Sequence, residues 1–128
     1  MELKGSNSVQ PVIEVLETFI SSSSLTYDQF ILSSFDHSQL FEAKKLQPKF
    51  KLGVLTEYDI LSVLNVAKEL DAYAIHPPIH SLTAEPIIKA KEQGFKVFVW
   101  TVNAKSLIEQ CKLWNVDGII TDFPNFVA

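Results

Sequence analysis

Apolar runs and amphipathic stretches alternate along the whole chain. The short runs, rich in β-branched and aromatic residues, predict strands at Glu2–Lys4, Phe30–Phe35, Lys51–Leu55, Ala72–Ile75, Lys96–Thr101 and Gly118–Thr121. The stretches between them carry apolar residues at helical spacing and predict helices near Pro11–Ser21, Ser38–Lys45, Glu57–Leu70, Thr83–Gln93 and Ala104–Trp114. Strands that alternate with helices across short connections are typical of a parallel sheet.

Several polar residues predict where these helices begin and end. Thr83 is suited to be the N-cap of the fourth helix, and Gly94 follows its last residue. Asn103 is expected to cap the last helix, and Asn115 to end it in a left-handed turn.

The predicted fold class is α/β, with two possible architectures. The strands "FILSSF", "KVFVW" and "DGIIT" are largely apolar on both faces, as parallel strands buried on both sides are. An open flavodoxin-like sheet and part of a TIM-type (β/α)8 barrel both fit this pattern. A whole barrel takes about 250 residues, so a chain of 128 holds about half of one. None of the four glycines forms a GxGxxG motif or a P-loop, so a nucleotide-binding open sheet lacks its usual signal.

Composition narrows the class of protein further. The net charge of −4 argues against a nucleic-acid partner, because no basic stripe is present to neutralise phosphates. We expect no transmembrane segment and no signal peptide, since no apolar run approaches the length of a membrane span. The single cysteine, Cys111, is expected to be a small buried apolar residue. These features favour a cytoplasmic domain.

Candidate functional residues follow the predicted strands, because the chemistry of parallel α/β folds gathers at the carboxyl ends of strands. Glu2 and Lys4 lie two residues apart and therefore point to the same side of their strand. The other strand ends read "SSFDH", which contains Phe35, "HPPIH", which begins with His76, "VWTVN", which contains Trp100, and "TDFP". The prolines after His76 forbid the helix that an H-x-x-x-H zinc site would need.

Ordinary structural roles compete with these assignments. Glu2 and Lys4 also fit a frayed, solvated N-terminus. Trp100 also fits the core of a parallel strand, and His76 fits a rigid loop. Pattern alone leaves both sets of readings open.

The segments "ELKG", "ILSSFDHSQL", "KLGVLTE", "AIHPPIHSLT", "GFKVFVWTVN" and "VDGIITDFPNFV" resemble the second half of the glycerophosphodiester phosphodiesterases. The resemblance implies a (β/α)8 barrel that hydrolyses glycerophosphodiesters to an alcohol and glycerol 3-phosphate with a divalent cation, Mg²⁺ or Ca²⁺. It implies that Glu2 is a metal ligand, that Lys4 contacts the phosphate and that Trp100 lines the substrate pocket. Phe35 and His76, at the ends of two other strands, are expected to line the same pocket.

The chain departs from the family pattern in one respect. The His-Arg-Gly strand, the Glu-x-Asp strand and the His-Asp segment, which supply the catalytic histidines and two metal ligands, do not occur. His37, His76 and His80 do not stand in those contexts. We therefore expect residues 1–128 to be a partial domain with an incomplete cation site, inactive alone. It would self-associate or pair with the missing N-terminal half; the alternative is a non-catalytic binding module.

Overall fold

One sheet of five parallel strands forms the centre of the chain, whose computed structural model describes residues 1–5 and 7–122. The strands are β1 (Ile31–Ser34), β2 (Lys51–Leu55), β3 (Ala74–His76), β4 (Lys96–Val99) and β5 (Gly118–Ile119). Each follows its neighbour in the chain and pairs with it in parallel. Five of the six predicted strands are therefore present. The strand predicted at Ala72–Ile75 was placed too early, and those predicted at Phe30–Phe35, Lys96–Thr101 and Gly118–Thr121 were too long.

Helices connect the strands. The α-helices are α1 (Val9–Ser22), α2 (His37–Leu46), α3 (Leu64–Leu70), α4 (Ala84–Glu92) and α5 (Lys105–Leu113). The short 3-10 helices are η1 (Tyr27–Gln29), η2 (Leu61–Val63) and η3 (Ile79–Ser81). Asp36 starts α2 by accepting a hydrogen bond from the backbone N–H of Ser38 at 3.1 Å, as an N-cap does.

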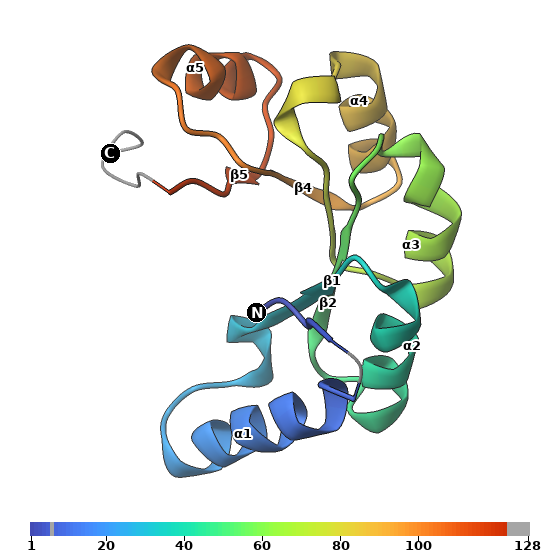
Figure 1. Ribbon diagram of the computed structural model, residues 1–128, viewed down its shortest axis with the longest axis vertical. Coiled ribbons are helices and arrows are strands. Elements are labelled where there is room, and N and C mark those ends of the chain that lie inside the picture. The colour runs from blue at the N-terminus through green and yellow to red at the C-terminus, as the bar shows by residue number, and fades with distance from the viewer. Residues whose placement is uncertain (6, 123–128) are drawn as a thin grey trace.

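The order of the strands decides between the two architectures. The sheet runs β1-β2-β3-β4-β5, so strands adjacent in the sequence are also adjacent in space. A flavodoxin-like sheet has the order 2-1-3-4-5 and carries helices on both faces. Here the sheet bends into an arc with the helices around its outer side and an open concave side (Figure 1). The fold is a partial barrel, and the open-sheet alternative is wrong.

The segment Met1–Lys4 adds a sixth extended piece beside β1. Ser33 donates its N–H to the carbonyl of Met1 at 2.8 Å, and Leu3 donates to the carbonyl of Ser33 at 2.7 Å. The prediction of a strand over Glu2–Lys4 is only partly right, because the pairing amounts to a single parallel bridge between Glu2 and Ser33. Leu3 is buried, so its two neighbours face the opposite side of the sheet.

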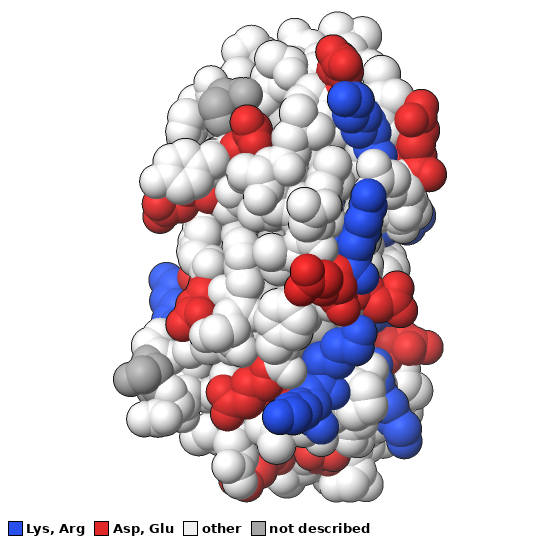
Figure 2. All heavy atoms as spheres, turned by 90° about the vertical axis from the view of Figure 1, so that its right-hand side faces the viewer, with Lys and Arg blue, Asp and Glu red and all other residues white. Residues whose placement is uncertain are grey.

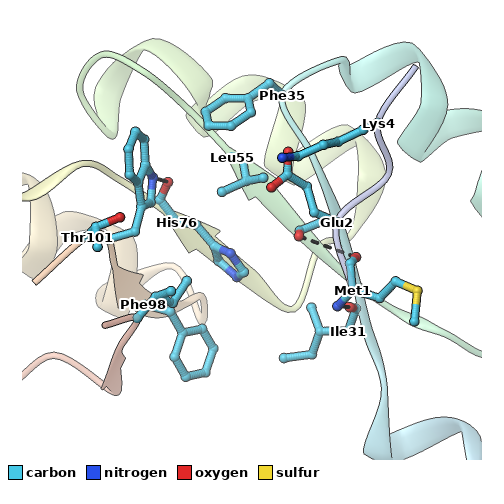
Figure 3. A pocket seen from close by; sticks show the side chains of 12 residues that line it. Met1, Glu2, Lys4, Ile31, Phe35, Leu55, His76, Phe98 and Thr101 are labelled. Atoms are coloured by element: carbon cyan, nitrogen blue, oxygen red, sulfur yellow. Dashed lines mark hydrogen bonds between the residues drawn. The ribbon is translucent and has the colours of Figure 1, made fainter. Parts of the chain in front are cut away.

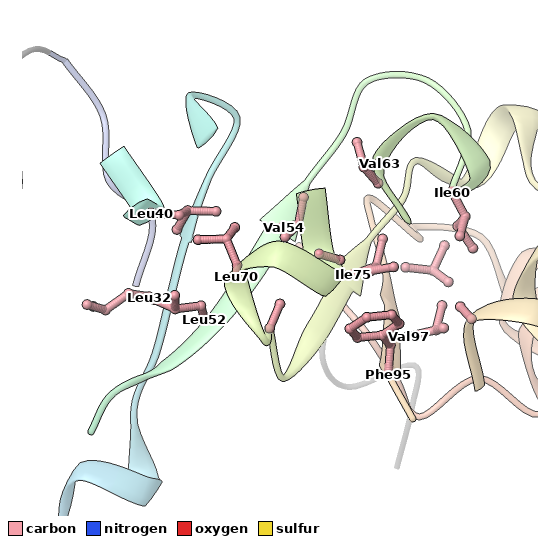
Figure 4. Close-up of a cluster of buried hydrophobic side chains, with 14 of the residues drawn as sticks. Leu32, Leu40, Leu52, Val54, Ile60, Val63, Leu70, Ile75, Phe95 and Val97 are labelled. Atoms are coloured by element: carbon pink, nitrogen blue, oxygen red, sulfur yellow. The ribbon is translucent and has the colours of Figure 1, made fainter. Parts of the chain in front are cut away.

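The hydrophobic core lies between the sheet and the helices. Leu32, Leu52, Val54, Ile75 and Val97 point from the strands toward the helices, as Figure 4 shows. Parallel strands covered by helices bury such aliphatic side chains at alternate positions. On the helix side the core includes Cys111, which is buried as predicted.

The outer, helical face is polar. Figure 2 shows lysine and acidic side chains mixed along the whole length of this face. Two ion pairs, Lys89 with Glu85 and Lys112 with Glu109, lie on exposed helix surface. Exposed pairs of this kind contribute little stability. None of the helices within residues 1–5 and 7–122 combines the length and the apolar composition that crossing a membrane requires.

The helix predicted at Glu57–Leu70 is wrong in its first half. The hydroxyl of Thr56 accepts the N–H of Tyr58 at 3.1 Å, and the carboxylate of Asp59 accepts the N–H of Ser62 at 2.9 Å. Such local side-chain bonds offer the backbone an alternative to the helix. The chain therefore turns before η2, and α3 begins only at Leu64.

The predicted helix ends are mostly in place. Gly94 and Asn115 adopt left-handed conformations, with φ of +92° and +56°, two residues after the ends of α4 and α5. Thr83 occupies the N-cap position of α4, but its side chain makes no capping hydrogen bond there.

Replacing Ile75 by alanine tests the position of the core. Ile75 lies on the middle strand and is fully buried, so Ile75→Ala should lower the free energy of unfolding by about 3 kcal/mol through lost burial and a residual cavity. Ile88→Ala removes the same atoms from an exposed site on α4 and should change stability by less than about 0.5 kcal/mol. Urea denaturation measures both, and equal losses would contradict this core.

Candidate functional site

A pocket of about 540 Å³ lies on the concave face, toward the carboxyl ends of the strands. Alternate residues along the strands line it, among them Ile31, Ser33 and Phe35 along β1 and just beyond it, and Phe98 and Trp100 along β4 and just beyond it. Side chains of parallel strands alternate between faces, so this set is the complement of the core set. The pocket is therefore the inner side of the partial barrel.

Glu2 and Lys4 form one wall of this pocket. Their side chains lie next to each other and point into it from the N-terminal segment (Figure 3). In the described part of the chain neither side chain has an ion-pair or hydrogen-bond partner. The structure thus places both residues on the side that the sequence predicts, with the carboxylate and the ammonium free to meet a ligand.

Trp100 forms the opposite wall. Its indole N–H donates to the backbone carbonyl of His76 at 2.9 Å, and its backbone N–H donates to the carbonyl of Pro77 at 3.1 Å. Its own carbonyl accepts the N–H of Ile79 at 2.6 Å. These three bonds hold Trp100 on the loop after β3, which explains the position of the "HPPI" sequence.

Phe35 joins the aromatic wall. Its ring meets that of Trp100 edge to face, with centroids 5.6 Å apart and an angle of 85°. Phe35 remains 38% exposed, so it borders the pocket without being a core residue. Together the two rings give the pocket a flat apolar side opposite the charged one.

His76 lies in the middle of the concave face, at the end of the central strand. The residue is only 6% exposed, and within the described chain neither ring nitrogen has a hydrogen-bond partner. Burial, and secondly the positive charge of the Met1 amino group, lower the pKa of His76 to about 4. The imidazole is therefore neutral near pH 7, with one N–H to donate and one nitrogen to accept.

Gly53 makes room for this imidazole. A Cβ atom on Gly53 would lie 2.6 Å from Nε2 and 2.8 Å from Cε1 of His76. The ring of Phe98 covers Gly118 on β5 in the same way, at 2.6 Å from the corresponding point. A glycine inside a strand often marks such a close approach, and this was the available signal for a contact that the sequence analysis missed.

The other histidines lie elsewhere. His37 begins α2, and its Nε2 lies 2.9 Å from the carbonyl oxygen of Leu55. His80 belongs to η3 and is exposed. Among the described residues that line the pocket, His76 is the one histidine. Phe98, Leu55 and Thr101 also line it and were not predicted.

Asn103 was predicted to cap α5, and this was wrong. The N-cap of that helix is Ala104, and the Asn103 side chain instead accepts the hydroxyl of Thr121 at 3.1 Å and the backbone N–H of Asp122 at 2.9 Å. It also donates to the Asp122 carboxylate at 3.0 Å. Asn103 therefore ties together the loops that follow β4 and β5.

The pocket does not by itself form a cation site. Glu2 is the one carboxylate among the described residues that line it. No cluster of three or more His, Cys, Asp or Glu residues suited to a metal ion occurs within residues 1–5 and 7–122. Mg²⁺ and Ca²⁺ take about six or more oxygen ligands, several of which the protein must supply or position. The residues present fit one ligand of such a site and not the whole site.

Comparison with known proteins places this arrangement in a family. The family model described as "Glycerophosphoryl diester phosphodiesterase family" matches residues 2–126. A glycerophosphodiester phosphodiesterase of Caldanaerobacter subterraneus is 36% identical over 97 residues, which are 76% of this chain and 40% of that protein.

Solved structures agree with the partial barrel. A glycerophosphodiester phosphodiesterase of Thermotoga maritima superimposes with a TM-score of 0.73 at 26% identity, covering 94% of this chain and 52% of that one. A phosphodiesterase of Oleispira antarctica, solved with the product sn-glycerol 3-phosphate, gives a TM-score of 0.83 at 23% identity and covers 96% of this chain and 50% of that one. The chain thus spans only about half the length of these proteins.

Burial of His76 predicts acid sensitivity. The unfolded chain, with an ordinary pKa of 6.5, binds a proton more readily than the folded chain, whose pKa is about 4. This contribution to stability is therefore complete above pH 6.5 and is lost as the pH falls toward 4, by about 3 kcal/mol in all. Denaturation across this range should show the loss in the natural chain, and His76→Gln should remove it. His80→Gln, at an exposed site, is the matched control; the same slope in all three chains would rule out the effect.

The contact between Gly53 and His76 gives a second prediction. Gly53→Ala should destabilise the chain by about 1–3 kcal/mol, because the new methyl group displaces the imidazole. In the His76→Ala background the same change should cost much less, since the obstructing ring is gone. A double-mutant cycle by urea denaturation measures the coupling, and additive effects would show that the two residues do not compete for this space.

Proposed function

The chain belongs to the glycerophosphoryl diester phosphodiesterase family, and from this we propose that it forms the C-terminal part of a metal-dependent glycerophosphodiester phosphodiesterase. The proposed reaction is hydrolysis of a glycerophosphodiester, such as glycerophosphocholine, to an alcohol and glycerol 3-phosphate. Because the chain spans about half of its relatives, we propose that it is inactive alone and acts together with the remaining part of the barrel.

The observation that carries this proposal is the pairing of two unlike walls in one pocket. A free carboxylate and a free ammonium, on Glu2 and Lys4, face an aromatic wall made by Trp100 and Phe35. A glycerophosphodiester likewise combines a charged part, the phosphate, with less polar parts, the organic groups on either side of it. The pocket supplies a contact of suitable chemistry for each part.

Each wall has a defined task in the proposed reaction. The Lys4 ammonium binds a non-bridging phosphate oxygen as a point charge and stabilises the negative charge that grows there during hydrolysis. The faces and edges of Trp100 and Phe35 pack against glycerol carbons. A quaternary ammonium such as choline would be attracted to the indole. Because three hydrogen bonds fix Trp100, little entropy is lost when the substrate binds.

Glu2 is proposed to be one ligand of a divalent cation, Mg²⁺ or Ca²⁺, whose remaining ligands come from outside this chain. When bound, such a cation supplies positive charge to the phosphate oxygens. Hard oxygen ligands suit both ions, which is consistent with a carboxylate at this position.

Protonation of the leaving oxygen is the step that the described residues do not provide. A general acid works best with a pKa near the working pH, whereas the pKa of His76 is held near 4 by burial. We assign His76 to the pocket floor, beneath the substrate, and place the acid and base on the remaining part of the barrel.

The proposed function is tested by release of glycerol 3-phosphate from glycerophosphocholine, with Mg²⁺ or Ca²⁺ and with chelator. The chain is assayed alone and joined to the part of the Caldanaerobacter relative that lies outside the match. We expect the joined protein to hydrolyse glycerophosphocholine, the isolated chain not to do so, and the chelator to abolish the hydrolysis. Activity of the isolated chain would overturn the division of labour, and binding without hydrolysis in either form would favour a non-catalytic module.

Lys4→Met in the joined protein should lower kcat/KM roughly a hundredfold, because a charge contact to the phosphate is lost while the side-chain length is kept. Lys112→Met, on the exposed surface of α5, is the matched control and should leave the rate within about twofold. If both variants hydrolyse glycerophosphocholine equally, Lys4 does not contact the phosphate.

A further inference from the structure

The partial barrel formed by the described residues lacks two of the eight strands that a closed (β/α)8 barrel contains. The five strands and the extended segment Met1–Lys4 make six parallel segments, which lie side by side in the order of the sequence. A (β/α)8 barrel closes with eight strands, so two remain to be supplied between β5 and the N-terminal segment. A second copy of this chain would bring six pieces instead of two, and the share of the relatives' length that the chain covers leaves ample sequence for two.

The interior of such a barrel is filled in layers. Each layer takes one side chain from each of four alternate strands. In this chain β1, β3 and the end of β5 are alternate, and Ser33, His76 and Ile120 from them all line the pocket. The fourth member of that layer would come from the strand next to the Met1–Lys4 segment, which lies across the barrel from β3.

His76 is the polar member of this layer that lacks a partner. Both ring nitrogens are buried and form no hydrogen bond with the described residues. This lowers the stability of the fold, because the nitrogens have lost their contact with water and gained no partner in exchange. The hydroxyl of Ser33, in contrast, donates to the carbonyl of Met1 at 3.5 Å. The Gly53 position is kept free of a side chain at the place where the ring lies. The side chain of His76, in the middle of the inner face, is therefore positioned to form a hydrogen bond with a residue on the opposite side of the barrel.

We infer that, when two further strands close this barrel, a hydrogen-bond acceptor side chain on the strand opposite β3 accepts the N–H of His76. This inference rests on the proposed function, because it takes the closing segment from the rest of the phosphodiesterase domain. His76 is then a positioning residue. Its side chain stabilises the closed barrel, and its backbone carbonyl, which accepts the indole N–H of Trp100, keeps Trp100 in place.

The imidazole can offer its N–H without repacking the pocket. A half-turn about the bond to the ring exchanges each nitrogen with a carbon and leaves the shape of the ring unchanged. The T-shaped contact with Phe98, at 5.5 Å between centroids, survives this exchange. Only one N–H is present on a neutral imidazole, so the closing segment needs an acceptor and not a cation.

The test compares His76→Phe in two settings. In the chain alone, phenylalanine removes two unpaired polar atoms and should raise the melting temperature by roughly 4 °C. In the joined protein the same substitution breaks the hydrogen bond across the barrel and leaves its acceptor unpaired, so the melting temperature should fall by a similar amount. A rise in both settings, or a fall in both, would overturn the inference.

A control variant and a second readout separate this inference from the proposed function. His76→Gln keeps a side-chain N–H and should recover most of the stability that phenylalanine removes from the joined protein. Hydrolysis of glycerophosphocholine is measured on the same samples. Opposite shifts without hydrolysis would refute the proposed function and support the closing contact, whereas hydrolysis without opposite shifts would refute the contact alone.

Discussion

A parallel sheet is normally covered on both faces, and the described residues of this chain cover only one of them. Helices lie along the outer side and bury the aliphatic side chains of alternate strand positions. The other positions face a concave surface that carries every candidate functional side chain. The same uncovered face therefore explains the pocket and why His76 has no hydrogen-bond partner among the described residues.

Short hydrogen-bonded bridges, and not long strands, position the two walls of the site. One bridge joins Glu2 to Ser33 and fixes the charged wall at the edge of β1, while another joins Pro78 to Trp100 and fixes the aromatic wall. Between these walls lies the central strand with His76. Because each wall is attached to a different side of the arc, the curvature of the sheet sets the distance between the charged and the aromatic groups.

The hydrophobic pattern was sufficient to predict the strands and the α/β class, because burial on a sheet face is a strong periodic signal. The hydrophobic pattern fitted both an open sheet and a barrel, and only the family resemblance favoured the barrel. The strand order β1-β2-β3-β4-β5 decides for the barrel on structural grounds. At Thr56 and Asp59 the prediction was wrong because their side chains bond the local backbone and delay the start of the helix to Leu64. At Asn103 a partner from a distant loop replaced the expected cap. The Gly53 contact joins β2 to β3; the glycine marks that something approaches the strand closely, but its partner, His76, lies too far along the chain to be identified from local pattern.

We propose that this chain contributes a phosphate-binding edge to a closed barrel, and a crystal structure of the joined protein with Ca²⁺ and sn-glycerol 3-phosphate would show this edge in use. We expect the phosphate between Lys4 and the cation, the Glu2 carboxylate among the ligands of that cation, and the glycerol carbons against Trp100. A product bound away from Lys4, or a cation held without Glu2, would contradict it.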